Sequence, residues 1–215
     1  MTDETTVASD ETVTETDQPL LKPSLTQFPW VRAAGASIAV LVIQYLVLVA
    51  SVALTSITVT RAGWSLWNKA VQYVFVLYSA HHVPIATTVD SDFQLGTSLN
   101  NLLYGQSLFP AALFFLLPIV ALTVAGFLFE RRRNPPAPVA IFEESTMVGT
   151  GFAIPYVLVG TIGSFVFVRR ISNEATQAAS APALLWALVA MFLFPMVFVT
   201  VGAVAAYGRN ETGQA

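Results

Sequence analysis

The chain of 215 residues contains no cysteine and few charged side chains. Without cysteine it cannot form disulfides, thiolate zinc sites or cysteine-ligated iron–sulfur clusters. Only 11% of its residues are charged, whereas a typical soluble domain has about 25%. This shortage of charge argues against an ordinary soluble enzyme, and a hydrophobic content of 55% argues against a disordered protein. We therefore expect an integral membrane protein.

The formal net charge of −3 is distributed unevenly along the chain. Residues 1–30 hold six acidic residues and one basic residue, so they carry −5, and residues 31–215 carry +2. The first segment is also rich in Thr and contains three prolines, and it cannot bury apolar surface. We predict a disordered acidic tail over 1–30, a transmembrane bundle over 31–209 and a short C-terminal tail over 210–215.

Four apolar runs are each long enough to form a membrane-spanning helix of about 20 residues. A fifth candidate, Leu66–Val89, is interrupted by Lys69, Gln72, His81 and His82. It either spans the membrane with its polar side chains facing other helices, or it lies re-entrant or interfacial. The four apolar runs are Ala33–Thr60, Leu108–Phe129, Met147–Val168 and Ala183–Tyr207.

Basic residues at the ends of these runs indicate the orientation in the membrane. Models with five and with four spans both give six basic residues inside and four outside, so the count does not separate them. Both models place the cluster Arg131–Arg133 and the C-terminus in the cytoplasm, and residues 90–106 outside. We favour an all-α bundle of five spans, with four as the alternative, because Leu66–Val89 is long enough to cross and Trp64 and Trp67 suit an interfacial anchor.

Two of the runs contain similar segments. Residues 115–124 and 192–201 match at six of ten positions. A parallel duplication would place two proline-broken helices around a shared site, as in some transporters. Coincidence among residues dominated by Phe, Leu and Val is the competing explanation, so whether the similarity is a true repeat stays open.

Three of the runs contain an internal proline. Proline removes a backbone donor and frees a carbonyl, and such breaks build binding sites in transporters. Two threonines, each five residues after a proline, could bond the freed carbonyls only through neighbouring turns or helices. Kinks that shape the packing are the simpler interpretation. The candidate residues are Pro118, Pro155, Pro195, Thr123 and Thr200.

The two histidines of the chain, His81 and His82, are adjacent, and Asp90 and Asp92 follow shortly. Adjacent histidines on a helix point about 100° apart, so they would not chelate one metal ion as an i, i+4 pair would. That constraint relaxes if the helix ends before Pro84. The four side chains could form a zinc or copper site or a proton-sensing cluster. An interfacial or hydrogen-bonded histidine pair is the simpler interpretation, so we predict neither a metal nor another cofactor.

The remaining patterns narrow the possible functions. The four apolar runs lack ionisable residues at their centres, which argues against an ion-coupled pump. The sequence contains no P-loop, Rossmann glycine pattern, H-E-x-x-H or G-x-S-x-G motif. No basic tract is longer than three residues, so we expect no nucleic-acid partner. The cluster Arg131–Arg133 is expected to contact anionic lipid head groups.

Three groups of short stretches stand out together. They are Trp67-Asn-Lys-Ala with Tyr78-Ser-Ala-His-His-Val83, Leu116-Leu-Pro-Ile-Val with Ala125-Gly126, and Ser180-Ala-Pro-Ala with Phe194-Pro-Met-Val-Phe198. In these stretches the chain resembles a family of uncharacterised haloarchaeal multi-pass membrane proteins that are sometimes labelled transporters. The resemblance implies an archaeal plasma-membrane location but no mechanism. His81 matches the family histidine, whereas His82 stands where an aromatic residue is usual.

Two features of composition suit this halophilic source. Arginine outnumbers lysine eight to two, and the N-terminal tail is acidic. We therefore expect a non-enzymatic protein of the plasma membrane, a subunit or scaffold that acts with membrane protein partners or as a homo-oligomer in the lipid bilayer. A small-solute transporter or channel built around the helices of Pro118 and Pro195 is the alternative. An intramembrane metalloenzyme that uses His81 and His82 is a third hypothesis.

Overall fold

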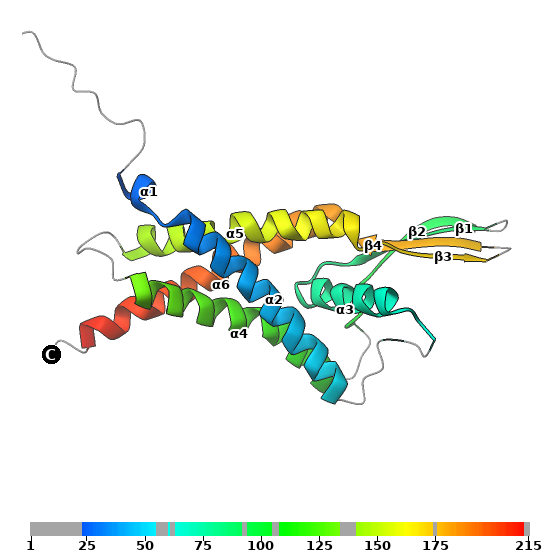
Figure 1. The fold of residues 1–215 in the computed structure, drawn as a ribbon, viewed down its shortest axis with the longest axis horizontal. Helices are drawn as coiled ribbons and strands as arrows, with labels where there is room; N and C mark the ends of the chain where they lie inside the picture. The colour runs from blue at the N-terminus through cyan, green and yellow to red at the C-terminus, as the bar shows by residue number, and fades with distance from the viewer. Residues whose placement is uncertain are drawn as a thin grey trace, which may run out of the picture.

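A computed structural model describes residues 23–54, 60, 63–91, 94–104, 108–133, 141–173 and 176–212. The long helices form a bundle, and a β-sheet extends beyond one end of it (Figure 1). The helices are α1 (Pro23–Gln27), α2 (Trp30–Leu54), α3 (Leu66–Ala80), α4 (Leu108–Arg133), α5 (Ile141–Val166) and α6 (Leu184–Thr212). The strands are β1 (Ile85–Ser91), β2 (Gln94–Asn100), β3 (Arg169–Asn173) and β4 (Thr176–Pro182).

Four helices, α2, α4, α5 and α6, are long and apolar enough to cross a membrane. The prediction of five spans is therefore wrong. Helix α3 has 15 residues, and a helix of that size is roughly 22 Å long, less than the hydrocarbon core of about 30 Å. The second half of the predicted span, up to Val89, forms a turn and strand β1 instead. The all-α class also needs correction, because a small antiparallel sheet accompanies the helices.

The even number of long helices brings three chain segments to the same end of the bundle. The guanidinium of Arg133, the last residue of α4, lies 5.5 Å from the ring centre of Phe28, just before α2. The hydroxyl of Tyr207, near the end of α6, donates to Glu130 of α4 at 2.6 Å. We call this end of the bundle, which carries Arg131–Arg133, the arginine end, and the opposite end the sheet end (Figure 1).

Most of the predicted acidic tail, residues 1–22, lies outside the described residues. From Pro23 the chain forms α1. The indole of Trp30, the first residue of α2, donates to the carbonyl of Leu25 in α1 at 2.9 Å. Phe28 is buried, and its ring lies 6.3 Å from that of Phe129. Within the predicted tail, Phe28 is therefore packed against the bundle.

The sheet is built from two hairpins that come from different parts of the chain. The β1–β2 hairpin follows α3, and the β3–β4 hairpin connects α5 to α6. They join through antiparallel pairing of β1 with β4, which gives the order β2-β1-β4-β3. At the base of the sheet the amide of Ala183 donates to the carbonyl of Pro84 at 2.9 Å. Both hairpins therefore leave the bundle at the same level.

One face of the sheet, here called the outer face, is exposed. Arg169 marks the opposite face, because its guanidinium donates to Gln72 of α3 at 2.6 Å and lies 5.0 Å from the ring centre of Trp64. Side chains alternate along a strand, so the neighbours of Arg169 and of its partners point away from α3. They are exposed and mostly short: Thr88, Asp90, Thr97, Leu99, Arg170, Ser172, Gln177 and Ala179.

Helices α4 and α6 run in the same direction and cross in backbone contact. A Cβ atom on Gly202 would clash with the carbonyl oxygen of Thr123, and one on Gly126 would clash with that of Val199. Small residues allow such close approach between membrane helices. The two similar segments, 115–124 and 192–201, therefore lie on a directly packed pair of helices.

Replacing Gly202 with Ala is expected to destabilise the protein. The added Cβ atom requires the α4–α6 crossing to open, at a cost of about 1–3 kcal/mol. Gly35→Ala is the matched control, because no heavy atom outside its own helix turn lies within 4 Å of the added methyl group. Thermal unfolding in detergent gives the melting temperatures of both variants. Equal melting temperatures for Gly202→Ala and Gly35→Ala would contradict the close crossing of α4 and α6.

Single cysteines can report the number of spans without background, because the chain has none. Gln27→Cys lies at the arginine end and Ser172→Cys lies in β3 at the sheet end. We expect a membrane-impermeant maleimide to label only one of them in intact cells, and the other only after permeabilisation. Labelling of both from the same side would favour an odd number of spans.

Candidate functional site

Helix α3 ends inside the molecule with a well-formed C-terminal cap. The amide of Val83 donates to the carbonyl of Tyr78, and the amide of His82 donates to that of Ser79, both at 3.0 Å. This is the Schellman pattern, which requires a left-handed residue, and His82 supplies it with a φ of 61°. Pro84 follows and cannot continue the helix. His81 is therefore the C-cap of α3, and His82 is the left-handed residue that follows it.

His81 is fully buried and lies at the centre of a hydrogen-bonded chain. Its Nδ1 lies 2.8 Å from the carbonyl oxygen of Leu77, and its Nε2 lies 2.7 Å from the hydroxyl of Tyr156 on α5. That hydroxyl lies 2.9 Å from the amide oxygen of Gln44 on α2. Tyr156 and Gln44 are also buried. We call His81, Tyr156 and Gln44 the buried triad; it joins α3, α5 and α2.

The carbonyl of Leu77 fixes the order of protons in the triad. A carbonyl only accepts, so Nδ1 of His81 carries a hydrogen, and in a neutral imidazole Nε2 must then accept. The hydroxyl of Tyr156 has one hydrogen, which it gives to His81. Rotation of the Gln44 amide by 180° then directs its NH2 group, which otherwise has no partner, toward the tyrosine oxygen. A protonated His81 would reverse the order and let Tyr156 donate to the Gln44 oxygen.

Burial lowers the pKa of His81 to about 4. The hydrogen bond to the carbonyl of Leu77 acts in the opposite direction, and the neighbouring His82 lowers the pKa further. Desolvation dominates because a buried imidazolium loses its hydration. At neutral pH His81 is therefore uncharged, and the hydroxyl of Tyr156 donates to its Nε2.

His82 faces a different environment from His81. It is exposed, stacks on the ring of Phe115 at 4.7 Å, and its Nδ1 lies 3.1 Å from the hydroxyl of Tyr104. The ring of Phe194 on α6 is the neighbour that the two histidines share, at 5.3 Å from His81 and 5.9 Å from His82. The two imidazoles therefore have different hydrogen-bond partners, Tyr156 for His81 and Tyr104 for His82.

The aspartates predicted to join the histidines are separated from them. Asp90 lies on β1, five residues beyond Ile85 at the base of the sheet, which corresponds to roughly 17 Å along an extended strand. Its side chain is on the exposed outer face. Asp92 lies outside the described residues. Within the described part of the chain, no group of three or more His, Asp or Glu residues is placed to hold a metal ion.

The three internal prolines lie in α4, α5 and α6, and two of them adjoin the triad. Pro155 immediately precedes Tyr156, and Pro195 immediately follows Phe194. Pro118 lies one turn beyond Phe115, the residue on which His82 stacks. The prolines are thus grouped around the end of α3.

The predicted threonines lie farther along the helices. The hydroxyl of Thr200 donates at 2.5 Å to the carbonyl of Met196 in its own helix, so it does not bond the carbonyl of Met191 that Pro195 frees. Thr123 presents its carbonyl oxygen to Gly202. Both residues belong to the α4–α6 crossing rather than to the triad.

Two further polar contacts hold α3 in place. The hydroxyl of Tyr78 donates to the carbonyl of Gly160 on α5. Near the middle of α3, Gln72 accepts from Arg169 of β3 at 2.6 Å. Together with the triad, these contacts connect a short helix to α2, α5 and the sheet.

A second buried polar cluster lies at the arginine end. Glu130 and Glu144 are almost fully buried, and Arg133 lies between them, 3.5 Å from Glu130 and in direct contact with Glu144. Tyr207 donates to the remaining oxygen of Glu130. Arg133 is thus engaged within the protein, whereas Arg131 and Arg132 are exposed. The predicted contact with lipid head groups therefore fits Arg131 and Arg132 better than Arg133.

Sequence reasoning missed Tyr156 and Glu144. Tyr156 follows the proline of an apolar run and looks like one more aromatic residue of that run. Glu144 lies before the apolar run Met147–Val168, whereas α5 begins at Ile141 and so includes Glu144. Gln44 was the available signal, since it is the one amide within the four apolar runs and a buried amide needs a partner.

Comparison with known proteins gives one match. The model of a family of unknown function (DUF7978) matches residues 14–210. The matched range includes the long helices, α3 and all four strands. No curated protein and no solved structure matches the chain.

The buried His81 should make stability depend on pH. The folded state keeps His81 neutral to about pH 4, whereas the unfolded chain takes up a proton near pH 6.5. Stability should therefore fall as the pH drops from 6.5 to 4, by about 3 kcal/mol for this residue. Unfolding of the wild type and of His81→Gln in detergent, compared at several pH values, isolates the contribution of this residue.

His82→Gln is the matched control, because His82 is exposed. It should keep the pH dependence of the wild type, while His81→Gln should be less stable at pH 7 and should lose stability less steeply on acidification. The same slope in all three proteins would contradict a neutral, buried His81.

Proposed function

This chain belongs to the DUF7978 family of unknown function, and we propose that it is a non-enzymatic membrane scaffold that presents its sheet to a protein partner. The observation that carries the proposal is the open sheet. Its outer face is exposed, and its edge strands, β2 and β3, each pair on one side only within the described chain. Unpaired edges offer backbone donors and acceptors to a partner strand.

The side chains of the outer face suit a partner rather than a small ligand. Thr88, Thr97 and Ala179 form one row across three strands, which Arg170 continues on β3, and the three short side chains make the centre of the face flat. A flat, weakly charged surface excludes water well only against another extended surface. The exposed Leu99 adds an apolar contact at the edge strand.

The sheet is also held rigidly, which favours binding because little ordering is needed. Arg169 connects β3 to α3 through Gln72, and Ala183 connects β4 to the carbonyl of Pro84. The buried triad in turn holds the end of α3. A partner would therefore meet a preformed surface fixed to the helical bundle.

The packing of α4 and α6 supports the transporter alternative less well. Substrate passage between these helices needs space near their prolines, and Pro118 and Pro195 are buried. Two turns farther along, the helices are in backbone contact at Gly126 and Gly202.

The proposal includes a location. The resemblance noted above supports a haloarchaeal plasma membrane. With four spans, six of the ten basic residues lie in the segments at the arginine end, so we place that end and both chain termini in the cytoplasm. The sheet would then meet its partner outside the cell.

Site-specific photo-crosslinking in the native membrane tests the scaffold. A benzophenone side chain at Thr88 or at Thr97 should form an adduct with one defined protein, identical for both positions, because the two residues are paired on the outer face. The same probe at Arg131, which is exposed at the opposite end, is the control. Mass spectrometry of the adducts identifies the partner.

A charge added to the outer face provides the second measurement. Thr88→Lys should remove the Thr97 adduct, since it puts an unpaired charge in the centre of the outer face. Absence of protein adducts at both sheet positions, or the same adducts at Arg131, would contradict the scaffold. Solute uptake into liposomes that contain only this protein would favour the transporter instead.

A further inference from the structure

A cavity of about 400 Å³ lies between α2 and α4 at the arginine end. Its walls are apolar: Ala36, Ala39 and Val40 come from α2, and Leu128 and Phe129 come from α4. The two alanines leave the space that larger side chains would fill. The cavity therefore offers an apolar surface at the end of two membrane-length helices.

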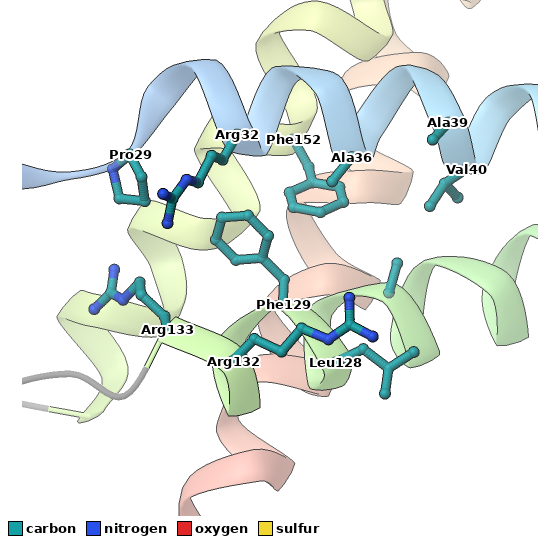
Figure 2. A pocket seen from close by; sticks show the side chains of 11 residues that line it. Pro29, Arg32, Ala36, Ala39, Val40, Leu128, Phe129, Arg132, Arg133 and Phe152 are labelled. Atoms are coloured by element: carbon teal, nitrogen blue, oxygen red, sulfur yellow. The ribbon is translucent and has the colours of Figure 1, made fainter.

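Three arginines line the same cavity. Figure 2 shows Arg32 from α2 and Arg132 from α4 entering the space between the helices, with Phe129 between them. Arg133 also lines it but is engaged by Glu130 and Glu144.

Arg32 and Arg132 are the cations available to a ligand. Both are exposed, and neither has a carboxylate partner among the residues that the structure describes. Two guanidinium groups beside an apolar cavity are complementary to a molecule with an anionic head and a hydrocarbon tail. Arginine binds phosphate oxygens through two parallel hydrogen bonds, which lysine cannot do.

We propose that this cavity binds an anionic phospholipid, with its head group at the rim that Arg32 and Arg132 line and one hydrocarbon chain against Ala36, Ala39 and Val40. The apolar walls distinguish this site from general attraction of a basic surface to a membrane. General attraction needs only exposed positive charge, and Arg131 supplies that equally well. The neighbouring Arg131 does not line the cavity.

Native mass spectrometry of the purified protein with phosphatidylglycerol tests the site. The wild type should retain phosphatidylglycerol in preference to phosphatidylcholine and show a higher melting temperature with the former. The double variant Arg32→Gln/Arg132→Gln should reduce phosphatidylglycerol binding about tenfold, as expected for loss of charge-assisted contacts. Arg131→Gln is the matched control and should bind like the wild type.

A variant that leaves every charge in place tests the contact between the cavity and the hydrocarbon chain of the lipid. Ala39→Leu should fill the cavity and lower phosphatidylglycerol binding, while circular dichroism confirms an unchanged helix content. Equal binding of the two lipids, or an equal loss in Arg131→Gln, would overturn the proposal in favour of general surface attraction. Displacement of the lipid by millimolar inorganic phosphate would overturn it in favour of a simple anion site.

Discussion

The arrangement of the molecule depends on the hydrogen-bonded triad of His81, Tyr156 and Gln44. Each of these side chains is buried, and an unpaired polar group in such a place costs about 1–3 kcal/mol. Each member therefore requires the other two, and the three come from α3, α5 and α2. The triad fixes where α3 stops inside the bundle. Because β1 begins a few residues later, it also fixes where the sheet begins.

Two of the internal prolines, Pro155 and Pro195, lie next to residues that contact His81. An internal proline removes one intrahelical hydrogen bond and allows a helix to bend. Pro155 and Pro195 adjoin Tyr156 and Phe194, the side chains against which His81 packs. Each of α5 and α6 therefore lacks one intrahelical hydrogen bond close to the residues that contact the end of α3. The prolines can thus shape the packing and still mark the most unusual site of the bundle, so the two interpretations considered from sequence are compatible.

The sequence was informative wherever a pattern is local. Four long helices follow from continuous apolar runs, whereas a fifth span up to Val89 was predicted where α3 in fact ends in a Schellman cap before Pro84. The sheet was not predicted, because β1 and β4 are rich in Ala, Thr and Ser and their pairing joins positions about 90 residues apart. His81 was singled out, but its partner Tyr156 lies 75 residues away in sequence. Apolar periodicity carries no information on which distant hydroxyl meets a histidine.

The arginine end shows why neighbouring charges in a sequence should not be treated as one group. Arg131, Arg132 and Arg133 are consecutive, but on a helix they point about 100° apart and meet three different environments. Arg133 is held between two buried glutamates, Arg132 lines an apolar cavity, and Arg131 is exposed away from both. Burial of Glu130 and Glu144 requires one cation, and this requirement orients the helix. The helical geometry then leaves Arg132 lining the cavity that Arg32 also lines, so the internal ion pairs determine which arginine is free to meet a lipid.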